Sequence, residues 1–481
     1  MSFVDIRFLV FFPLVLIANF LTPARFRWIV LLAASYFFYM SWKPEYGLIL
    51  LAITVLDFVS ALMIGKSDSH AKRKAWLMVS LVGNIGLLFV FKYFNFIFDS
   101  ISSVFHAFGS DTSLPLLNLL LPIGISFHVF QSISYTIDVY MRRVEPVNHF
   151  GKFALYVAFF PQLVAGPIER PKTLLPQFFE DRRFNPELAR RGAHLMAWGF
   201  FKKLVIADNL APLVNAAFAT PADFPGPTLA LAAALFAYQI YCDFSGYTDI
   251  ARGAANILGY ELVLNFNRPY ASGSVGEFWK RWHISLSSWF RDYVYIPLGG
   301  NRGSASRTRS NLLATFLLSG LWHGANWTYV IWGGINGVYL VIENALAKRG
   351  ITIGKSLFSV PLTFILICVT WVFFRAETVS GAVSILARIP TGIPEFLSSL
   401  TSIDAMRHVL AMDYGLQALL IGVLGIIFME TVDFFRSRGI VHARLSTASA
   451  PARYALYVAF AIALVCAGSF GGAHQFIYFQ F

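Results

Sequence analysis

Long apolar runs recur from one end of the chain to the other, and they constrain the fold more than any other feature. The chain has 481 residues, of which 57% are hydrophobic and only 13% are charged, and its mean hydropathy is +0.61. Soluble domains carry about twice that share of charged residues. Runs of about 20 apolar residues can cross a bilayer as helices, which satisfy every backbone polar group internally. The sequence therefore predicts an all-α integral membrane protein, with residues 1–481 forming a single domain.

The apolar runs predict about ten or eleven transmembrane helices. The clearest candidates are residues 3–22, 28–42, 46–64, 76–98, 114–140, 192–216, 229–258, 357–374, 412–435 and 454–470. The apolar residues 150–170 differ, because Pro161, Gly166 and Pro167 interrupt them and basic residues flank both ends. We therefore expect a re-entrant or interfacial segment there.

Basic residues follow alternate apolar runs and predict the topology. The loops after the first, third and fifth runs contain two or more Lys or Arg residues, whereas residues 99–113 contain none. Since positive loops stay in the cytoplasm, these three loops are predicted to be cytoplasmic and the N-terminus external. The last eleven residues carry no Lys or Arg, which predicts an external C-terminus. Such loops also account for the net charge of +12 without a nucleic-acid partner.

One basic segment is unusually aromatic. It reads "FWKRWHISLSSWF" over residues 278–290, and Trp279, Trp282 and Trp289 recur at helical spacing with basic residues between them. This pattern is typical of an amphipathic helix at a membrane interface. We expect residues 277–290 to form one such helix at the inner interface, with the tryptophans against lipid or protein.

His323 lies at the depth of the bilayer according to this topology. Arg309 and Lys348 are both predicted to be cytoplasmic, and the 38 residues between them suffice for two crossings with His323 near the midpoint. Low dielectric disfavours the charged imidazole, so a neutral His323 could act as a base while Asn326 polarises a carbonyl. The alternative is a structural histidine. Gly320 and Gly324 flank it and permit either a break in the helix or close backbone approach.

Other polar residues in the apolar runs have a structural interpretation and a functional one. For Asp57, Lys92 and Asp138 we favour hydrogen bonds or ion pairs between helices. Asp243, Ser245, Tyr247 and Asp249 fall within seven residues, so either helix pairing or a lined cavity explains them. The three cysteines are far apart and predict neither a metal site nor a disulfide framework.

Five stretches together resemble the membrane-bound O-acyltransferase family, in its bacterial branch typified by alginate O-acetylase. They are "GISFHVFQSISYTIDVYMRR" (124–143), "FFPQLVAGPIERP" (159–171), "YQIYCDFSGYTDIARG" (238–253), "NFNRPYASGSVGEFWKRWHISLSSWFRDYVYIPLGGNR" (265–302) and "GLWHGANWTYVIWGG" (320–334). The terminal "FIYFQF" is also similar to that branch.

This resemblance implies a multi-helix fold around a central tunnel, with an acyl donor entering from the cytoplasm and an acceptor from the other side. The family's invariant histidine corresponds to His323 and a second important histidine to His283. Candidates for lining the tunnel are Trp322, Asn326, Asp243, Ser245, Tyr247 and Arg281. The basic cytoplasmic residues suit acetyl-CoA or an acylated carrier protein as donor, with no bound cofactor.

The expected function is transfer of an acetyl group across the bacterial inner membrane for O-acetylation of an exopolysaccharide such as alginate. Periplasmic O-acetyltransferase partners would complete the reaction. Related alternatives are acyl or D-alanyl transfer to cellulose, peptidoglycan or teichoic acid. An anion transporter is less consistent with the sequence, because it usually shows paired repeats that we do not find. A non-catalytic scaffold for polysaccharide synthesis would leave His323 unexplained.

Overall fold

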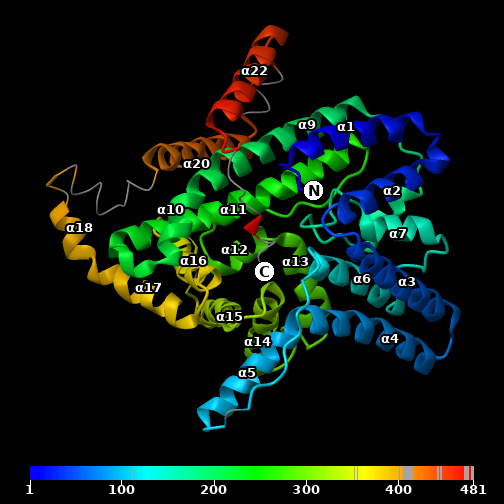
Figure 1. The fold of residues 1–481 in the computed structure, drawn as a ribbon, viewed down its shortest axis with the longest axis horizontal. Helices are drawn as coiled ribbons and strands as arrows, with labels where there is room; N and C mark the ends of the chain where they lie inside the picture. The colour runs from blue at the N-terminus through cyan, green and yellow to red at the C-terminus, as the bar shows by residue number, and fades with distance from the viewer. Residues whose placement is uncertain are drawn as a thin grey trace. The chain divides into compact units, whose positions relative to one another are not determined.

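Helices make up all the regular structure in the part of the chain that the structure describes (Figure 1). The computed structural model describes residues 1–110, 112–351, 353–354, 356–399, 401–402, 404, 415–440, 444, 447–470 and 476–477. These residues group into two compact units, one of Met1–Met196 with Thr248–Leu264 and one of Ala197–Tyr247 with Asn265–Phe481. The single domain over residues 1–481 stays a prediction.

The first unit contains the N-terminal helices. They are α1 (Ile6–Leu21), α2 (Arg27–Met40), α3 (Glu45–Lys66), α4 (His70–Leu88), α5 (Phe94–Ala107), α6 (Ile125–Tyr140), α7 (Phe150–Ala158) and α8 (Pro171–Leu174). Two further helices, α9 (Pro186–Phe200) and α11 (Gly226–Ile257), contribute residues to both units. A π-helical turn at Phe89–Tyr93 joins α4 to α5.

The second unit contains the remaining helices. They are α10 (Asp208–Ala219), α12 (Val275–Arg281), α13 (Ile284–Phe290), α14 (Ala305–His323), α15 (Trp327–Lys348), α16 (Ser359–Arg375), α17 (Val379–Thr391), α18 (Ile393–Ser399), α20 (Leu416–Ser437) and α22 (Ala450–Ala467). π-Helical turns at Phe201–Ala207 and Arg291–Tyr295 precede α10 and follow α13.

Six helical segments among the described residues are long and apolar enough to cross a membrane. They are Glu45–Lys66, His70–Ala107, Gly226–Ile257, Trp327–Lys348, Leu416–Ser437 and Ala450–Ala467. Three shorter apolar helices, α1, α16 and α17, coincide with or follow other predicted crossings. The all-α membrane fold is confirmed, while the total of ten or eleven crossings stays a prediction.

The predicted helix over residues 114–140 is wrong in its first half. Residues 112–124 form no helix, and α6 begins only at Ile125. Pro115 and Pro122 explain the difference, since proline inside a helix removes a hydrogen bond and clashes with the preceding turn. Gly124 then adopts a φ of +75° directly before α6. By contrast, residues 150–170 form the nine-residue α7 and a buried turn, which is too short for a single span, as expected.

Buried polar side chains in the first unit pair with one another, as the structural interpretation predicted. The Asp57 carboxylate accepts hydrogen bonds from Ser80 and from Nδ2 of Asn84, the latter at 3.0 Å, while Thr136 lies 3.3 Å away. These partners lie on α4 and α6, so Asp57 on α3 links three helices. Asp138 instead forms a 3.1 Å ion pair with the half-exposed Arg143, which lies five residues later directly after α6, so this pairing is local rather than between helices.

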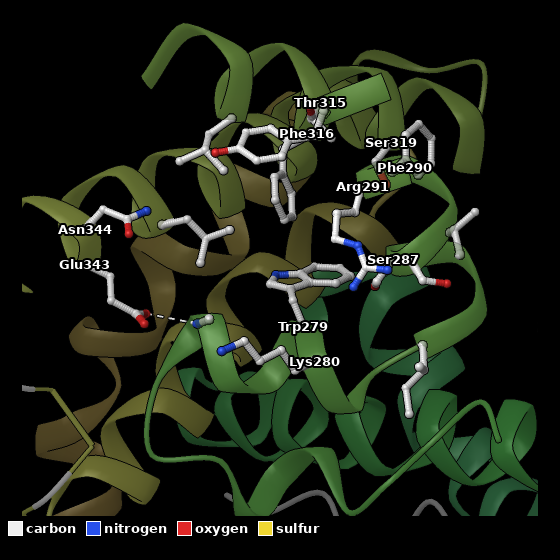
Figure 2. Close-up of a pocket in the computed structure, with 17 residues that line it drawn as sticks. Trp279, Lys280, Ser287, Phe290, Arg291, Thr315, Phe316, Ser319, Glu343 and Asn344 are labelled. Carbon is white, nitrogen blue, oxygen red and sulfur yellow. Dashed lines mark hydrogen bonds between the residues drawn. The ribbon is translucent and has the colours of Figure 1, made fainter. Parts of the chain in front are cut away.

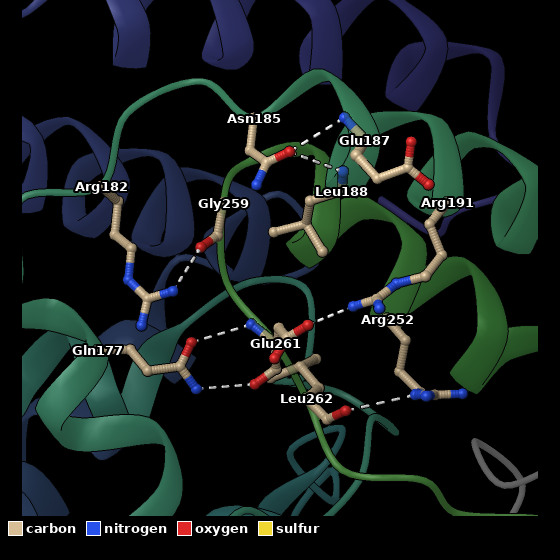
Figure 3. Close-up of polar contacts among 10 residues, drawn as sticks. All are labelled: Gln177, Arg182, Asn185, Glu187, Leu188, Arg191, Arg252, Gly259, Glu261 and Leu262. Carbon is tan, nitrogen blue, oxygen red and sulfur yellow. Dashed lines mark hydrogen bonds and ion pairs between the residues drawn. The ribbon is translucent and has the colours of Figure 1, made fainter.

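Polar contacts also hold the segment that follows α11 in the first unit (Figure 3). Gln177 exchanges two hydrogen bonds of 2.9 Å with the main chain of Glu261. The Glu261 carboxylate forms an ion pair with Arg191, and Arg182 donates to the carbonyl of Gly259. The chain therefore leaves α11 along a defined path before it reaches Asn265, where the second unit resumes.

Candidate active site

A tight helical hairpin places His323 at the end of α14. A Cβ added to Gly320 would lie 2.3 Å from the carbonyl oxygen of Tyr329, and one on Gly333 would lie 2.2 Å from that of Phe316. Only glycine fits such contacts, so α14 and α15 approach each other backbone to backbone. Gly324 caps α14, and a Cβ there would meet the Tyr329 ring at 2.2 Å. The predicted close approach beside His323 is confirmed.

His323 is buried, and its hydrogen bond identifies the nitrogen that can accept a proton. The side chain is 4% exposed, and its Nδ1 lies 2.7 Å from the carbonyl oxygen of Ser319. A carbonyl oxygen can only accept, so Nδ1 carries the hydrogen and Nε2 carries the lone pair. Trp332 and Phe374 contact the imidazole edge to face, with ring centroids at 4.7 and 5.7 Å. The ring is thus fixed in orientation and tautomer.

The predicted continuous amphipathic helix over residues 277–290 is wrong. The segment forms two short helices, α12 and α13, with a break at Trp282 and His283. His283 has a φ of +43° and a ψ of 54°, a left-handed conformation that costs a non-glycine residue about 1–2 kcal/mol. Trp279, Trp282 and Trp289 are all buried in the protein, at 9%, 0% and 6% exposure. The break turns His283 inward.

The hairpin and the broken helix bring the two predicted histidines together. The ring centroids of His283 and His323 are 6.4 Å apart, with the ring planes at 69°. His283 is fully buried against Phe244, at 4.8 Å between centroids. Burial lowers the pKa of His283 well below its ordinary value, and nearby His323 lowers it further. His283 therefore lies in an environment that favours neutral imidazole.

Trp322 joins this cluster, while its predicted role in lining the tunnel stays a prediction. It is 4% exposed, and its ring lies 5.0 Å from His323 and 6.1 Å from His283. Trp332, Phe374 and the Ser319 carbonyl complete the surroundings of His323 and were not predicted. The signal for Trp332 was present in the same tryptophan-rich stretch, whereas Phe374 comes from α16 and lies 51 residues further along the chain.

Two polar residues of α11, Asp243 and Ser245, pair with lysines of the π-helical turn at Phe201–Ala207. Asp243 forms a 2.7 Å ion pair with Lys203, which also pairs with Asp208 at 2.8 Å. Ser245 accepts a 2.9 Å hydrogen bond from Lys202. The first of the two earlier alternatives, helix pairing, accounts for both of these α11 residues.

The last residues that the structure describes also pack on α11. The main-chain N–H of Ile477 donates to Asp243 at 2.7 Å. Tyr247 stacks on Phe476 with ring centroids at 4.7 Å. Phe476 in turn lies 5.7 Å from Phe244, the ring that contacts His283. Tyr247 and Asp243 thus hold this segment behind the histidine pair.

Arg281 and Asn326 make contacts that the sequence did not predict. Arg281 pairs with Glu277 at 2.5 Å on the partly exposed side of α12. Asn326 caps α15 by accepting from the N–H of Thr328 at 2.9 Å, and its Nδ2 donates to the carbonyl of Glu377 at 3.1 Å. Both Oδ1 and Nδ2 of Asn326 are therefore hydrogen-bonded within the protein. The role of Asn326 in polarising a substrate carbonyl stays a prediction without geometric support.

A cavity of about 470 Å³ opens beside the hairpin in the second unit (Figure 2). Trp279 lies in its middle, with Lys280 and Arg291 as cations and Glu343 as a carboxylate around it. Ser319 also lines the cavity, and its carbonyl oxygen is the acceptor for His323. The rings of Trp279 and Trp332 are 5.6 Å apart, so an aromatic contact connects the cavity wall to the His323 surroundings. Among the described residues, no group of acidic, histidine and cysteine side chains could hold a metal ion.

Similarity to known proteins identifies the family of this chain. The membrane-bound O-acyltransferase family (MBOAT) matches residues 147–350, which include both histidines and the cavity. The probable alginate O-acetylase AlgI of Azotobacter vinelandii is 43% identical over 377 residues, covering 77% of this chain and 74% of the relative. The chain belongs to the membrane-bound O-acyltransferase family. As a member, it is a multi-pass membrane O-acyltransferase, which excludes the transporter and scaffold interpretations.

Other relatives of this O-acyltransferase act on different polymers according to their names. The probable alginate O-acetylase AlgI of Pseudomonas aeruginosa is 42% identical, over 77% of this chain and 71% of the relative. The peptidoglycan O-acetyltransferase of Helicobacter pylori is 34% identical, over 75% of this chain and 72% of the relative. The O-acyltransferase thus shares more identity with the alginate-named relatives than with the peptidoglycan-named one.

Proposed function

We propose that this O-acyltransferase moves an acetyl group from a cytoplasmic thioester across the bacterial inner membrane for O-acetylation of an exopolysaccharide such as alginate. Periplasmic partner proteins complete the transfer to the polymer. The 42–43% identity to relatives named alginate O-acetylase supports this choice of polymer. Peptidoglycan is the second candidate, at 34% identity, and teichoic acid D-alanylation is more distant, at 29%.

The buried pair of His323 and His283 carries the proposal. Because the Ser319 carbonyl holds the hydrogen on Nδ1, Nε2 of His323 is positioned as a general base. It removes the proton of an acceptor hydroxyl as the oxygen attacks the thioester carbonyl carbon. The C–O bond forms, the C–S bond breaks, and the proton passes from Nε2 to the leaving thiolate. The products are an ester and a thiol, with His323 neutral again.

The cavity beside Ser319 suits the thioester donor. Its volume of about 470 Å³ lies within the range of small-molecule sites. The walls from Trp279, Phe290 and Phe316 suit the uncharged arm of a thioester, and Lys280 and Arg291 suit phosphate groups. Acetyl-CoA and an acylated carrier protein both present this combination. The donor is a substrate, and the proposed reaction uses no bound cofactor.

Transfer by the purified protein in vesicles tests the proposal. Labelled acetyl-CoA, or an acetylated carrier protein, is supplied on one side and a polysaccharide acceptor with its periplasmic partner on the other. We expect label to reach the acceptor with wild-type protein and not with His323→Ala. Failure of both donors with correctly inserted wild-type protein would contradict the proposal, and so would movement of intact donor across the vesicle.

The proposed direction of transfer requires a defined topology. We expect residues 66–74 and 302–309 in the cytoplasm, and residues 220–228 and the N-terminus outside, because the basic loops alternate. The C-terminus is also proposed to be external, although residues 478–481 lie outside the described part of the chain. Single cysteines at His70 and Ala222, in a background without the three native cysteines, should react with a membrane-impermeant thiol reagent on intact spheroplasts only at position 222. Labelling at position 70 would contradict the proposed topology, because it would place residues 66–74 outside.

His283→Ala should lower transfer less than loss of His323 does. His283 is proposed to support the donor rather than move the proton, because it directly precedes α13, whose residues Ile284, Leu286 and Phe290 line the donor cavity. Initial rates over a range of donor concentrations should show a raised KM that high donor concentration overcomes. His106→Ala, which changes an exposed histidine of α5, is the matched control and should behave as wild type. An equal loss at all donor concentrations would place His283 in the chemical step.

A further inference from the structure

The left-handed backbone at His283 is held by contacts from a segment far away in the sequence. The N–H of Ile284 donates to the carbonyl of Asn265 at 2.9 Å, and the N–H of Asn267 donates to the carbonyl of Arg281 at 2.9 Å. Residues 265–267 therefore run alongside the break between α12 and α13 and bond to it on both sides of His283. A φ of +43° at a non-glycine residue persists only where its surroundings enforce it.

The Asn265 side chain adds a second set of contacts. Its Oδ1 accepts from the N–H of Ser285 at 3.2 Å and from Oγ of Ser285 at 2.9 Å. Asn265 is 1% exposed, so water does not compete for these bonds. The side chain thus holds the first turn of α13, whose preceding residue is His283. Phe266, next in the chain, lies parallel to the His283 ring at 6.4 Å and 9°.

From these contacts we infer that Asn265 is a positioning residue for His283. Its amide oxygen and main-chain carbonyl lock the turn that points the imidazole toward His323, 6.4 Å away. Without the Oδ1 acceptor, the N–H and hydroxyl of Ser285 lose a buried partner, and the turn relaxes from its left-handed conformation. The inference rests on the proposed acyl transfer, because it assigns Asn265 an effect that passes through His283.

Asn265→Ala should lower kcat/KM for the donor by about 10- to 100-fold, through the same raised KM as His283→Ala, the effect expected from a displacement of roughly 1 Å at an active site. Asn267→Ala is the matched control, because its exposed side chain is removed while its main-chain bond to Arg281 stays. That variant should transfer at the wild-type rate. Asn265→Asp keeps the acceptor oxygen and should recover most of the activity that Asn265→Ala loses.

A double-mutant cycle distinguishes positioning from a general structural role. If Asn265 acts through His283, the variant with both His283→Ala and Asn265→Ala is no slower than His283→Ala alone. Multiplicative losses would overturn the inference, and so would an Asn265→Ala rate within twofold of wild type. The His323→Gln rate tests the proposed function separately. If His323→Gln is inactive, the proposed function holds whether the Asn265 inference is supported or overturned.

If Asn265→Ala fails to fold, Ser285→Ala can replace it in the double-mutant cycle with His283→Ala. It removes the hydroxyl bond to Asn265 and leaves the main-chain bond in place. A loss of kcat/KM for the donor that disappears in the His283→Ala background supports the inference. Unchanged kcat/KM, or a loss that persists in that background, overturns it.

Discussion

His323→Gln should abolish measurable acetyl transfer while the protein remains folded and inserted in the membrane. General acid–base groups contribute about 10²–10⁴-fold to rate, and a glutamine amide cannot accept the hydroxyl proton. Glutamine keeps the approximate size of histidine and fits against Trp332 and Phe374. The loss should appear in kcat at saturating donor, measured with purified protein and labelled thioester.

Two comparisons separate a lost base from a disturbed hairpin. His323→Asn retains an amide N–H near the position of Nδ1, so it preserves the bond to the Ser319 carbonyl and removes only the Nε2 side of the ring. It should be as inactive as His323→Gln, with the same thermal unfolding midpoint as wild type. If either variant keeps near wild-type transfer, His323 is a structural residue and the general base lies elsewhere.

Lys203→Met should destabilise the protein much more than removal of an exposed charge does. Lys203, Asp208 and Asp243 are all buried, at 5%, 6% and 1% exposure, and the lysine pairs with both carboxylates. Removing the shared cation leaves two buried aspartates without a counter-charge, which costs about 3–5 kcal/mol. Thermal unfolding in detergent should show a midpoint several degrees lower, and the yield of inserted protein should fall.

Neutralising the whole cluster provides the control. Adding Asp208→Asn and Asp243→Asn to Lys203→Met removes the uncompensated charge, and Asn at position 243 still accepts from the N–H of Ile477. This triple variant should recover much of the lost stability. Glu187→Ala breaks an ion pair with Arg190 that is exposed on both sides, and it should leave the unfolding midpoint almost unchanged. Equal destabilisation by Glu187→Ala and Lys203→Met would contradict the role of burial.

Local sequence signals predicted the helical membrane class and the close backbone approach beside His323. Apolar runs in a bilayer form helices because the hydrocarbon offers the backbone N–H and C=O groups no hydrogen-bond partner, and a helix pairs these groups internally. Gly320, Gly324 and Gly333 lie in the same short stretch as His323, so the close hairpin could be anticipated from neighbouring residues. The missing first half of the 114–140 helix also had a local signal, since Pro115 and Pro122 stand within it.

The sequence by itself determined that this chain is a helical membrane protein with a buried histidine at a glycine-packed turn. Only the tertiary structure decided that the aromatic segment breaks at His283, because its spacing suits one helix and the bonds that stabilise the left-handed turn come from Asn265. In the same way, the partner of Asp243 on α11 is Lys203, 40 residues earlier. The periodicity of a sequence indicates which face of a helix is buried. Buried polar groups and strained turns are instead stabilised by partners elsewhere in the chain, and only the packing of the helices determines which residues these partners are.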